Sequence, residues 1–253
     1  MADRMKNKLN HLFSFLILTL AFFNTYSQSQ PFSLVSIQNR YKATWPKSIT
    51  YIEQVHHEQY KKVDDYRVYH AYDFPGIHRI DMGDPDDGNS KIIINDMFHE
   101  FRSYKKLAPF LNRNLIEYYI LGEIYFDQPE GAKQYFIANG IDMNKTGSGN
   151  WEGKKVLIFG AKSIGEQSGV QLYYDAQLLV PLRLVDYRSG RALESRFKIK
   201  QYNGYWLLES TRKLLGSKQI EYSIVAEPKT GVKIDPKVFD LENFGSYHWY
   251  EKH

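Results

Sequence analysis

The second half of the chain is a succession of short strand-like segments separated by residues that favour tight turns. These segments are rich in β-branched and aromatic residues and cover residues 151–159, 170–175, 182–187, 191–202, 206–214 and 219–227. The sequence between them contains Gly160, Ser189-Gly190, Asn203-Gly204 and Gly216-Ser217. Such residues close β-hairpins, so most strands are expected to pair antiparallel with the next one. The sequence therefore predicts a fold dominated by antiparallel strands.

A shorter meander is expected in the first half of the chain, after two strands at about residues 49–55 and 63–72. Its elements are a chain break at Phe74-Pro75-Gly76, a strand at 77–82, a turn at 83–88 and a hairpin at 91–101 closed on Asn95-Asp96. The 20 Tyr and 15 Phe residues of the chain agree with a high strand content, because aromatic side chains favour strands.

Two helical regions are expected, one before the strands and one between the two groups of strands. Residues 31–44 carry Leu34, Ile37 and Tyr41 at helical spacing, and Trp45-Pro46 ends the pattern.

The second region covers residues 112–139. Its first half has one apolar face, made by Leu115, Ile116, Tyr119 and Ile120. Gly122 follows this face, Asp127-Gln128-Pro129 starts another helix, and Gly140 stops it.

This order of elements predicts an α+β fold in which the helices gather on one face of a large antiparallel sheet. A sheet of about ten or more strands tends to curl, and its concave face either is filled by the helices or leaves a cavity beneath them. In the last strand, Ile220, Tyr222 and Ile224 alternate with polar residues. We expect these three side chains to point inward.

The start of the chain has the features of a signal peptide. Arg4, Lys6 and Lys8 precede an apolar run at residues 12–23, which is too short for a membrane span of roughly 20 residues. Small residues at Thr25 and Ser27 predict cleavage before Gln28. The expected organisation is thus a signal peptide at 1–27 and a single domain at 28–253.

The amino-acid composition argues against several classes of protein. There is no cysteine, which excludes a disulfide framework and a lipidated cysteine. The net charge falls from +4 to +2 without residues 1–27, because they carry three basic side chains and one acidic one. So weak a charge, spread along the chain, does not predict nucleic-acid binding.

Four stretches resemble the LolA-like proteins, a family of bacterial envelope lipoprotein carriers and their relatives. YDFPGIHRID with IIINDMFHEF, within residues 72–101, resembles the family's early strands. NWEGKKVLIFGA, VQLYYDAQLLVPLRLVDY and VKIDPKVFDLENFG, at 150–161, 170–187 and 232–245, are similar to its central and closing segments.

The resemblance extends from about residue 33 to residue 249. It implies a curved, half-open antiparallel barrel of about eleven strands, with helices as a lid over an apolar cavity. In the carriers, this cavity shields acyl chains in the periplasm. The resemblance therefore implies a soluble, monomeric periplasmic protein without a stable membrane span. Its ligand would be a lipid, a fatty acyl chain or a lipoprotein, with an envelope protein as a further partner.

The resemblance also marks site residues. Carriers of this pattern have an arginine before the proline of the Pro-Gly turn, whose contacts control the lid, whereas this chain has Phe74 there and a strand arginine at Arg79. Phe74 and Arg79 are therefore the gating candidates. The ligand-binding candidates are the apolar residues Leu34, Ile37, Tyr41, Leu115, Ile116, Tyr119, Ile120, Ile220, Tyr222 and Ile224.

Other constellations favour structural interpretations. The histidines His56, His57, His70, His78 and His99 lack the cysteines or spaced carboxylates that complete a tetrahedral metal site. Residues 84–88 lack the ligand spacing of a calcium loop, which leaves a turn as the preferred interpretation.

Ser163 and Ser168 lie in a glycine-rich stretch without the Gly-x-Ser-x-Gly elbow of a serine nucleophile. We therefore predict a binding or carrier protein of the outer-membrane lipoprotein-sorting type, without enzymatic activity, cofactor or metal. The alternatives are an envelope sensor or interaction module of the same fold and, less favoured, a hydrolase.

Overall fold

The computed structural model describes residues 33–59, 62–111 and 116–250. The described residues from Leu34 onward belong to one compact unit. The expected signal peptide, its cleavage site and Leu115 lie outside the described residues. Within the described ranges, no helix has both the length and the apolar character that a membrane crossing requires.

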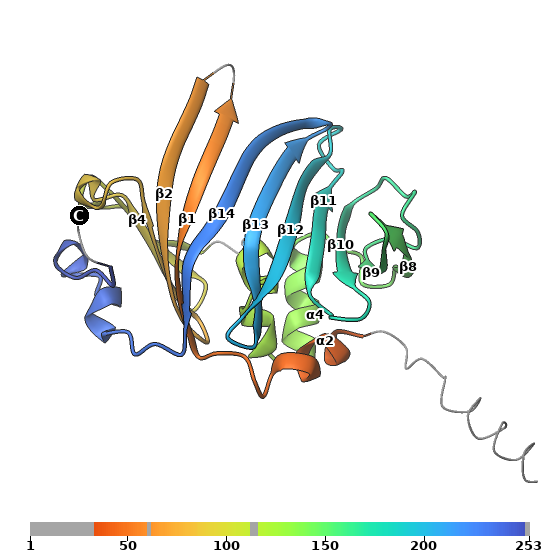
Figure 1. Ribbon diagram of the computed structural model, residues 1–253, viewed down its shortest axis with the longest axis horizontal. Coiled ribbons are helices and arrows are strands. Elements are labelled where there is room, and N and C mark those ends of the chain that lie inside the picture. Colours follow the sequence, from red (N-terminus) through yellow and green to blue (C-terminus); the bar gives the residue numbers. More distant parts are fainter. Residues whose placement is uncertain (1–32, 60–61, 112–115, 251–253) are drawn as a thin grey trace, which may run out of the picture. The chain divides into compact units, whose positions relative to one another are not determined.

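Fourteen strands form one sheet in the described part of the chain (Figure 1). The first seven are β1 (Ser48–Gln59), β2 (Lys62–Asp73), β3 (Ile77–Met82), β4 (Ser90–Ile94), β5 (Met97–Arg102), β6 (Lys105–Lys106) and β7 (Phe110–Leu111). The others are β8 (Thr146–Trp151), β9 (Lys154–Phe159), β10 (Val170–Asp175), β11 (Pro181–Asp186), β12 (Leu193–Tyr202), β13 (Tyr205–Leu215) and β14 (Lys218–Thr230).

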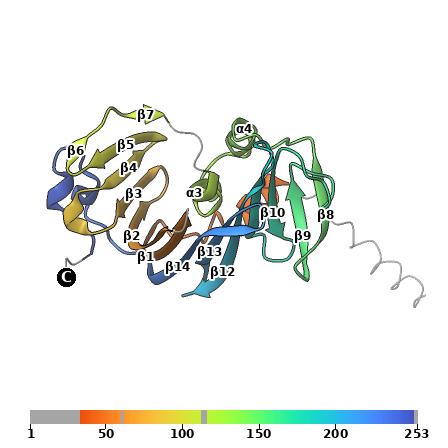
Figure 2. The same ribbon diagram turned by 90° about the horizontal axis from the view of Figure 1, so that it is seen from above.

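The strands run in the order β6-β5-β4-β3-β2-β1-β14-β13-β12-β11-β10-β9-β8, and β7 pairs with β5. Each of these neighbours pairs antiparallel, which confirms the predicted meanders. Because β6 and β8 do not meet, the sheet is open and curved and does not close into a barrel (Figure 2). The α+β class is confirmed, with more strands than the eleven expected.

Three helices accompany the sheet in the described residues: α2 (Leu34–Tyr41), α3 (Ile116–Ile120) and α4 (Pro129–Ala138). Four 3₁₀ turns complete the described elements: η1 (Pro85–Asp87), η2 (Glu123–Tyr125), η3 (Pro236–Phe239) and η4 (Phe244–Ser246). Figure 2 shows α3 and α4 within the curve of the sheet. Pro129 opens α4, where a missing backbone N–H is tolerated, and Gly140 follows it with a φ of 87°.

The helices are shorter than the sequence predicts. The first expected helix, at 31–44, is the eight-residue α2. The second region, at 112–139, is divided into α3, η2 and α4 within its described residues. Gly122 lies between α3 and η2, and a Cβ added there would come within 2.4 Å of the Phe74 ring. Tertiary contact with the sheet thus breaks the helix at a residue that can accept it.

The predicted strand at 151–159 is wrong at its start. Glu152 and Gly153 form a turn between β8 and β9, with φ angles of 48° and 79°. The strand β8 lies before this turn. It was not predicted because it contains Gly147 and Gly149, and glycine has a low strand propensity. A Cβ on Gly147 would lie 2.4 Å from the carbonyl oxygen of Lys162, so the glycine permits a close crossing of the chain.

The prediction of which side chains of β14 point inward is also wrong. Ser223 and Val225 are buried, whereas Ile224 between them is 43% exposed. Since successive side chains of a strand point to opposite faces, Tyr222 and Ile224 lie on the other face, whereas Ile220 lies at a register irregularity between β13 and β14. The inward face carries polar side chains, because Ser223 donates a hydrogen bond to Glu53 of β1. The apolar alternation of β14 therefore marks the face turned away from the helices.

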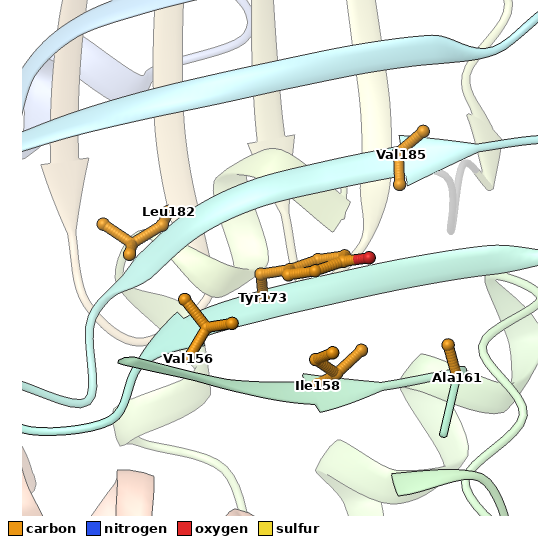
Figure 3. Close-up of a cluster of buried hydrophobic side chains, with 6 residues drawn as sticks. All are labelled: Val156, Ile158, Ala161, Tyr173, Leu182 and Val185. Atoms are coloured by element: carbon orange, nitrogen blue, oxygen red, sulfur yellow. The ribbon is translucent and has the colours of Figure 1, made fainter. Parts of the chain in front are cut away.

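A filled core joins β9, β10 and β11 (Figure 3). Its buried members are Val156, Ile158, Ala161, Tyr173, Leu182 and Val185. Ile164, from the glycine-rich stretch after β9, packs against this cluster. Glu166 of the same stretch accepts hydrogen bonds from Lys145 Nζ at 2.6 Å and from the Lys162 N–H at 3.0 Å. This stretch is a loop between β9 and β10, so Ser163 and Ser168 lie between two strands and not between a strand and a helix.

Residues 236–250 pack around a buried arginine of β3. Arg79 is fully buried, and its Nε donates to both carboxylate oxygens of Asp81 at 2.9 and 3.0 Å. Its guanidinium also donates to the carbonyl oxygens of Val238 at 2.6 Å, Tyr247 at 2.7 Å and Phe244 at 3.2 Å. Arg79 therefore ties the C-terminal segment to the sheet.

We expect the substitution Arg79→Met to lower the free energy of unfolding by about 3–5 kcal/mol. It leaves the Asp81 carboxylate buried without its main charge partner, and three carbonyl groups lose their donor. Urea unfolding measures the loss, and amide exchange should accelerate in residues 236–250.

The control is Arg102→Met, because that side chain is 69% exposed and forms its ion pair with Glu100, two residues earlier on the same strand. Its expected effect is below about 1 kcal/mol. Adding Asp81→Asn to Arg79→Met should recover part of the loss. A loss below about 1 kcal/mol for Arg79→Met would contradict the structural role of this arginine.

Candidate functional site

A cavity of about 360 Å³ lies between the helical segment 116–138 and the β2–β4 part of the sheet. Small-molecule sites in proteins typically have volumes of about 300–1,000 Å³. The cavity is lined by Tyr72, Pro75, Gly76, His78, Ile93, Asn95, Asp96, Tyr118, Tyr119, Glu123, Phe126, Asp127 and Tyr135. Strand ends and turns of the sheet thus form one wall, and α3, η2 and α4 form the other.

The β2–β3 turn joins the two walls. Phe74 contacts Gly122 and stacks on Phe126, with ring centroids 5.3 Å apart. The N–H of Gly76 donates to Glu123 Oε1 at 2.9 Å. Gly76 has a φ of 85°, a conformation that favours glycine. One side of the cavity is therefore closed by an apolar contact and a hydrogen bond to the same 3₁₀ turn.

The sheet wall is a stack of aromatic and imidazole rings. Tyr72 stacks on His78 at 3.7 Å between centroids, and Tyr51 stacks on His70 at 4.4 Å. The hydroxyls of Tyr51 and Tyr72 lie 3.3 Å apart, within hydrogen-bond distance. The register of β1, β2 and β3 causes this arrangement, since Tyr51 pairs with His70 and Tyr72 pairs with His78.

A buried hydrogen-bond chain runs from β1 to the cavity wall. Glu53 Oε2 lies 3.1 Å from His70 Nε2, and His70 Nδ1 lies 3.2 Å from His78 Nε2. Burial by itself raises the pKa of Glu53, but hydrogen bonds from His70 and Ser223 hold the pKa below its ordinary value. Burial lowers the pKa of His78 well below its ordinary value, with a further effect of the His70 charge. Glu53 is thus a carboxylate, and His78 is neutral.

A second polar group connects α3 to the sheet. Glu117 accepts a hydrogen bond from Ser195 Oγ at 2.5 Å, and its other oxygen lies 3.6 Å from Lys213 Nζ. Lys213 also pairs with Glu221 at 2.9 Å. Burial lowers the pKa of Lys213, but the charges of Glu117 and Glu221 outweigh burial and raise it. The position of α3 is therefore fixed partly by charges.

The helix wall carries carboxylates. Burial raises the pKa of Glu123 to about 7, and the hydrogen bond from Gly76 offsets part of this effect. Asp127 accepts a hydrogen bond from Tyr119 at 2.7 Å. Tyr119 also stacks on Tyr135 of α4, with centroids 3.9 Å apart. The cavity is therefore aromatic with an acidic side.

The structure separates the expected ligand-binding residues. Tyr119 lines the cavity. The next residue, Ile120, is buried but is not part of the cavity lining. Leu34, Ile37 and Tyr41 are buried on α2, where Tyr41 packs on Tyr125 at 5.3 Å. Of the described candidates, Tyr119 alone lines the cavity. Ile116 is half-buried on α3, and Tyr222 and Ile224 lie on the other face of β14. Ile220 is half-buried at a register irregularity of the same strand.

The two gating candidates lie in different places. Phe74 contacts the helical segment at the edge of the cavity, as a gating role requires. Arg79 instead contacts the C-terminal segment, and its neighbours in β3, His78 and Ile80, point to the opposite face of the strand. The gating role of Phe74 stays a prediction, whereas Arg79 has a structural explanation.

Sequence reasoning missed the chain Glu53, His70 and His78. The sequence predicts that these histidines lie in strands. It also predicts that His70 and Tyr72, two residues apart in one strand, point to the same face. What the sequence does not show is the register that places His78 opposite Tyr72 and Glu53 near His70. Long-range pairing decides such contacts.

No protein-family model matches the sequence, and no curated protein matches it. Solved structures do match. A LolA superfamily protein from Nitrosomonas europaea has 13% identity and a TM-score of 0.55 over 83% of this chain and 98% of its own. A domain of a proposed outer membrane lipoprotein-sorting protein from Vibrio parahaemolyticus has 14% identity and a TM-score of 0.55, covering 84% and 98%.

A DUF1329 family protein from Desulfovibrio piger is similar as well, with 12% identity and a TM-score of 0.57 over 82% of this chain and 94% of its own. The three matches cover most of the described residues. At such identities they show the fold, which is LolA-like. The expected resemblance is thereby confirmed at the level of the fold.

Glu123→Gln should change how stability depends on pH. Because the folded protein raises the pKa of Glu123 from 4.5 to about 7, the protonated carboxyl stabilises the fold at low pH. This contribution is lost as the pH rises through about 7. Relative to the parent protein, the glutamine variant should gain up to about 3 kcal/mol between pH 4.5 and pH 8, measured by urea unfolding.

Glu130→Gln provides the control, because Glu130 is an exposed residue of α4. Its stability should follow that of the parent protein at every pH. A glutamine variant of Glu123 whose stability runs parallel to the parent's would show that the carboxyl is not buried as described.

Proposed function

We propose that this LolA-like fold serves a binding protein that takes up an acyl chain of a lipid or lipoprotein and releases it, without catalysing a reaction. The cavity beneath the helices is the observation that carries this proposal. Its wall contains Tyr72, Ile93, Tyr118 and Phe126, which offer apolar surface to a chain. Each methylene moved from water into such a site contributes about 0.8 kcal/mol.

The place of action that we propose is the periplasm. The basic start, the apolar run at 12–23 and the small residues before Gln28 support export with removal of residues 1–27. A protein of the outer membrane lipoprotein-sorting type would work in this compartment. We further propose that it acts there as a monomer, with a lipid or lipoprotein as its partner.

Opening of the helical segment would admit the chain. The segment consists of the five-residue α3, η2 and the ten-residue α4, and helices this short depend on packing for their stability. Its contacts with the β2–β3 turn are the stack of Phe74 on Phe126 and the hydrogen bond from Gly76 to Glu123. Phe74 would therefore act as an apolar gate, in the position where carriers have an arginine.

Neutral alkanols should bind with affinities that rise with chain length. From octanol to dodecanol, each pair of methylenes should improve affinity about tenfold or more, because apolar burial adds about 0.8 kcal/mol per methylene. Displacement of the fluorescent probe N-phenyl-1-naphthylamine measures this. Affinity independent of chain length would contradict an acyl-chain site.

Two variants of α4 locate the site. Tyr135→Lys puts a charged amine into the cavity lining and should weaken dodecanol binding at least tenfold. Ile137→Lys is the matched control, because this side chain is 46% exposed on the same helix. Equal binding by both variants would place the ligand elsewhere.

Ligand should slow amide exchange in the helical segment. With dodecanol bound, residues 116–120 should exchange more slowly, because local opening then requires loss of ligand contacts. Residues 206–214, in β13, should change little. Protection of both regions alike, or of neither, would show that the helices are a fixed part of the core.

A further inference from the structure

The hydrogen-bond chain Glu53–His70–His78 ends on a nitrogen without a partner. His78 is 4% exposed and lines the cavity, and its Nδ1 is buried with no hydrogen-bond partner among the described residues. Buried polar atoms are nearly always paired, so an unpaired one needs an explanation. A ligand that enters the cavity and bonds to this nitrogen provides one.

The chain determines what kind of partner His78 can take. His70 must use its Nε2–H toward the Glu53 carboxylate, which is an acceptor only. When both imidazoles are neutral, His70 Nδ1 is then an acceptor, and the proton between the rings belongs to His78 Nε2. His78 Nδ1 is left with a lone pair. The ligand atom that meets it has to be a hydrogen-bond donor.

The charges of the cavity favour a cation. The charged groups among its described lining residues are Asp96, Glu123 and Asp127, and this lining contains no lysine or arginine. Asp127 already accepts hydrogen bonds from Tyr119 and from its own neighbour Gln128. Glu123 accepts a hydrogen bond from the Gly76 N–H through Oε1, and its side chain is half-buried at the cavity. A positively charged donor would relieve the cost of ionising Glu123.

We propose that the ligand of this cavity is an amphiphile with a primary ammonium head, which donates to His78 Nδ1 and pairs with Glu123. This inference rests on the proposed function, since the acyl chain provides the rest of the contact. Beyond the proposed function, the cavity would select the head group of the ligand by its positive charge and by its N–H donors. An anionic fatty acid would be the least favoured occupant.

Four C12 probes that differ only in the head test the proposal: dodecylamine, dodecanol, dodecyltrimethylammonium and dodecanoate. They compete with N-phenyl-1-naphthylamine at pH 8, where imidazole side chains are ordinarily neutral, and below their micelle concentrations. Dodecylamine should bind at least tenfold more tightly than dodecanoate. It should also exceed dodecyltrimethylammonium, which has the charge but no N–H donor.

Variants assign the two contacts. Glu123→Gln keeps an oxygen for the Gly76 N–H and should weaken dodecylamine binding about tenfold more than it weakens dodecanol binding. His78→Phe keeps a ring beside Tyr72 and should reduce the preference for dodecylamine over dodecyltrimethylammonium. Glu130→Gln, on the exposed side of α4, should alter neither. If His78→Phe does not fold, the glutamine variant and the probe series still decide.

The outcomes separate this inference from the proposed function. If the four probes bind equally, or dodecanoate binds best, the ammonium proposal is wrong while acyl-chain binding stands. If no probe displaces the dye, the proposed function fails together with the inference. Lysophosphatidylethanolamine should also outcompete lysophosphatidylcholine, which has the same chain without N–H donors, and the reverse order would contradict the proposal.

Discussion

The pairing of β1 with β14 holds this fold together. It joins the first strand of one meander to the last strand of the other, across more than 160 residues of chain, in eight residue pairs that include Ile49 with Thr230 and His57 with Glu221. Both strands are long, and without this ladder each meander would expose an unpaired edge. The pairing also places Ser223 beside Glu53, so that the same contact fixes the beginning of the hydrogen-bond chain toward the cavity.

The sheet uses its two faces differently. Around β3, one face binds the C-terminal segment through Arg79. The guanidinium donates hydrogen bonds to Asp81 and to backbone carbonyl oxygens. The opposite face carries His78 and meets the helical segment across the cavity. Because successive residues of a strand point in opposite directions, neighbours in sequence face the C-terminal segment and the cavity separately. This explains why an arginine expected at the gate is a structural residue here, and why Phe74 takes the position beside the helices.

The cavity combines apolar rings with buried polar groups, and in the proposed function the polar groups provide its specificity. An apolar site alone would favour longer chains without distinguishing their heads. Buried polar groups are expensive when unpaired, so a lone pair on His78 and a carboxylate on Glu123 discriminate against ligands that leave them unsatisfied. The chain back to Glu53 fixes the imidazole tautomer, as a carboxylate hydrogen-bonded to a histidine does in other proteins. Selectivity for the head and affinity for the chain can thus reside in one cavity.

Local signals in the sequence determined the antiparallel strands, since the strands at 77–82 and 170–175 and the turn at Asn95-Asp96 coincide with the structure. Apolar patterning also indicated the helices, and the motifs indicated the LolA-like fold. The sequence did not determine which face of β14 points inward, because a period of two defines two faces and only the partners decide which one is covered. For the same reason it did not reveal the chain Glu53, His70 and His78. These side chains meet through strand register and through the pairing of distant strands, which only the tertiary structure establishes.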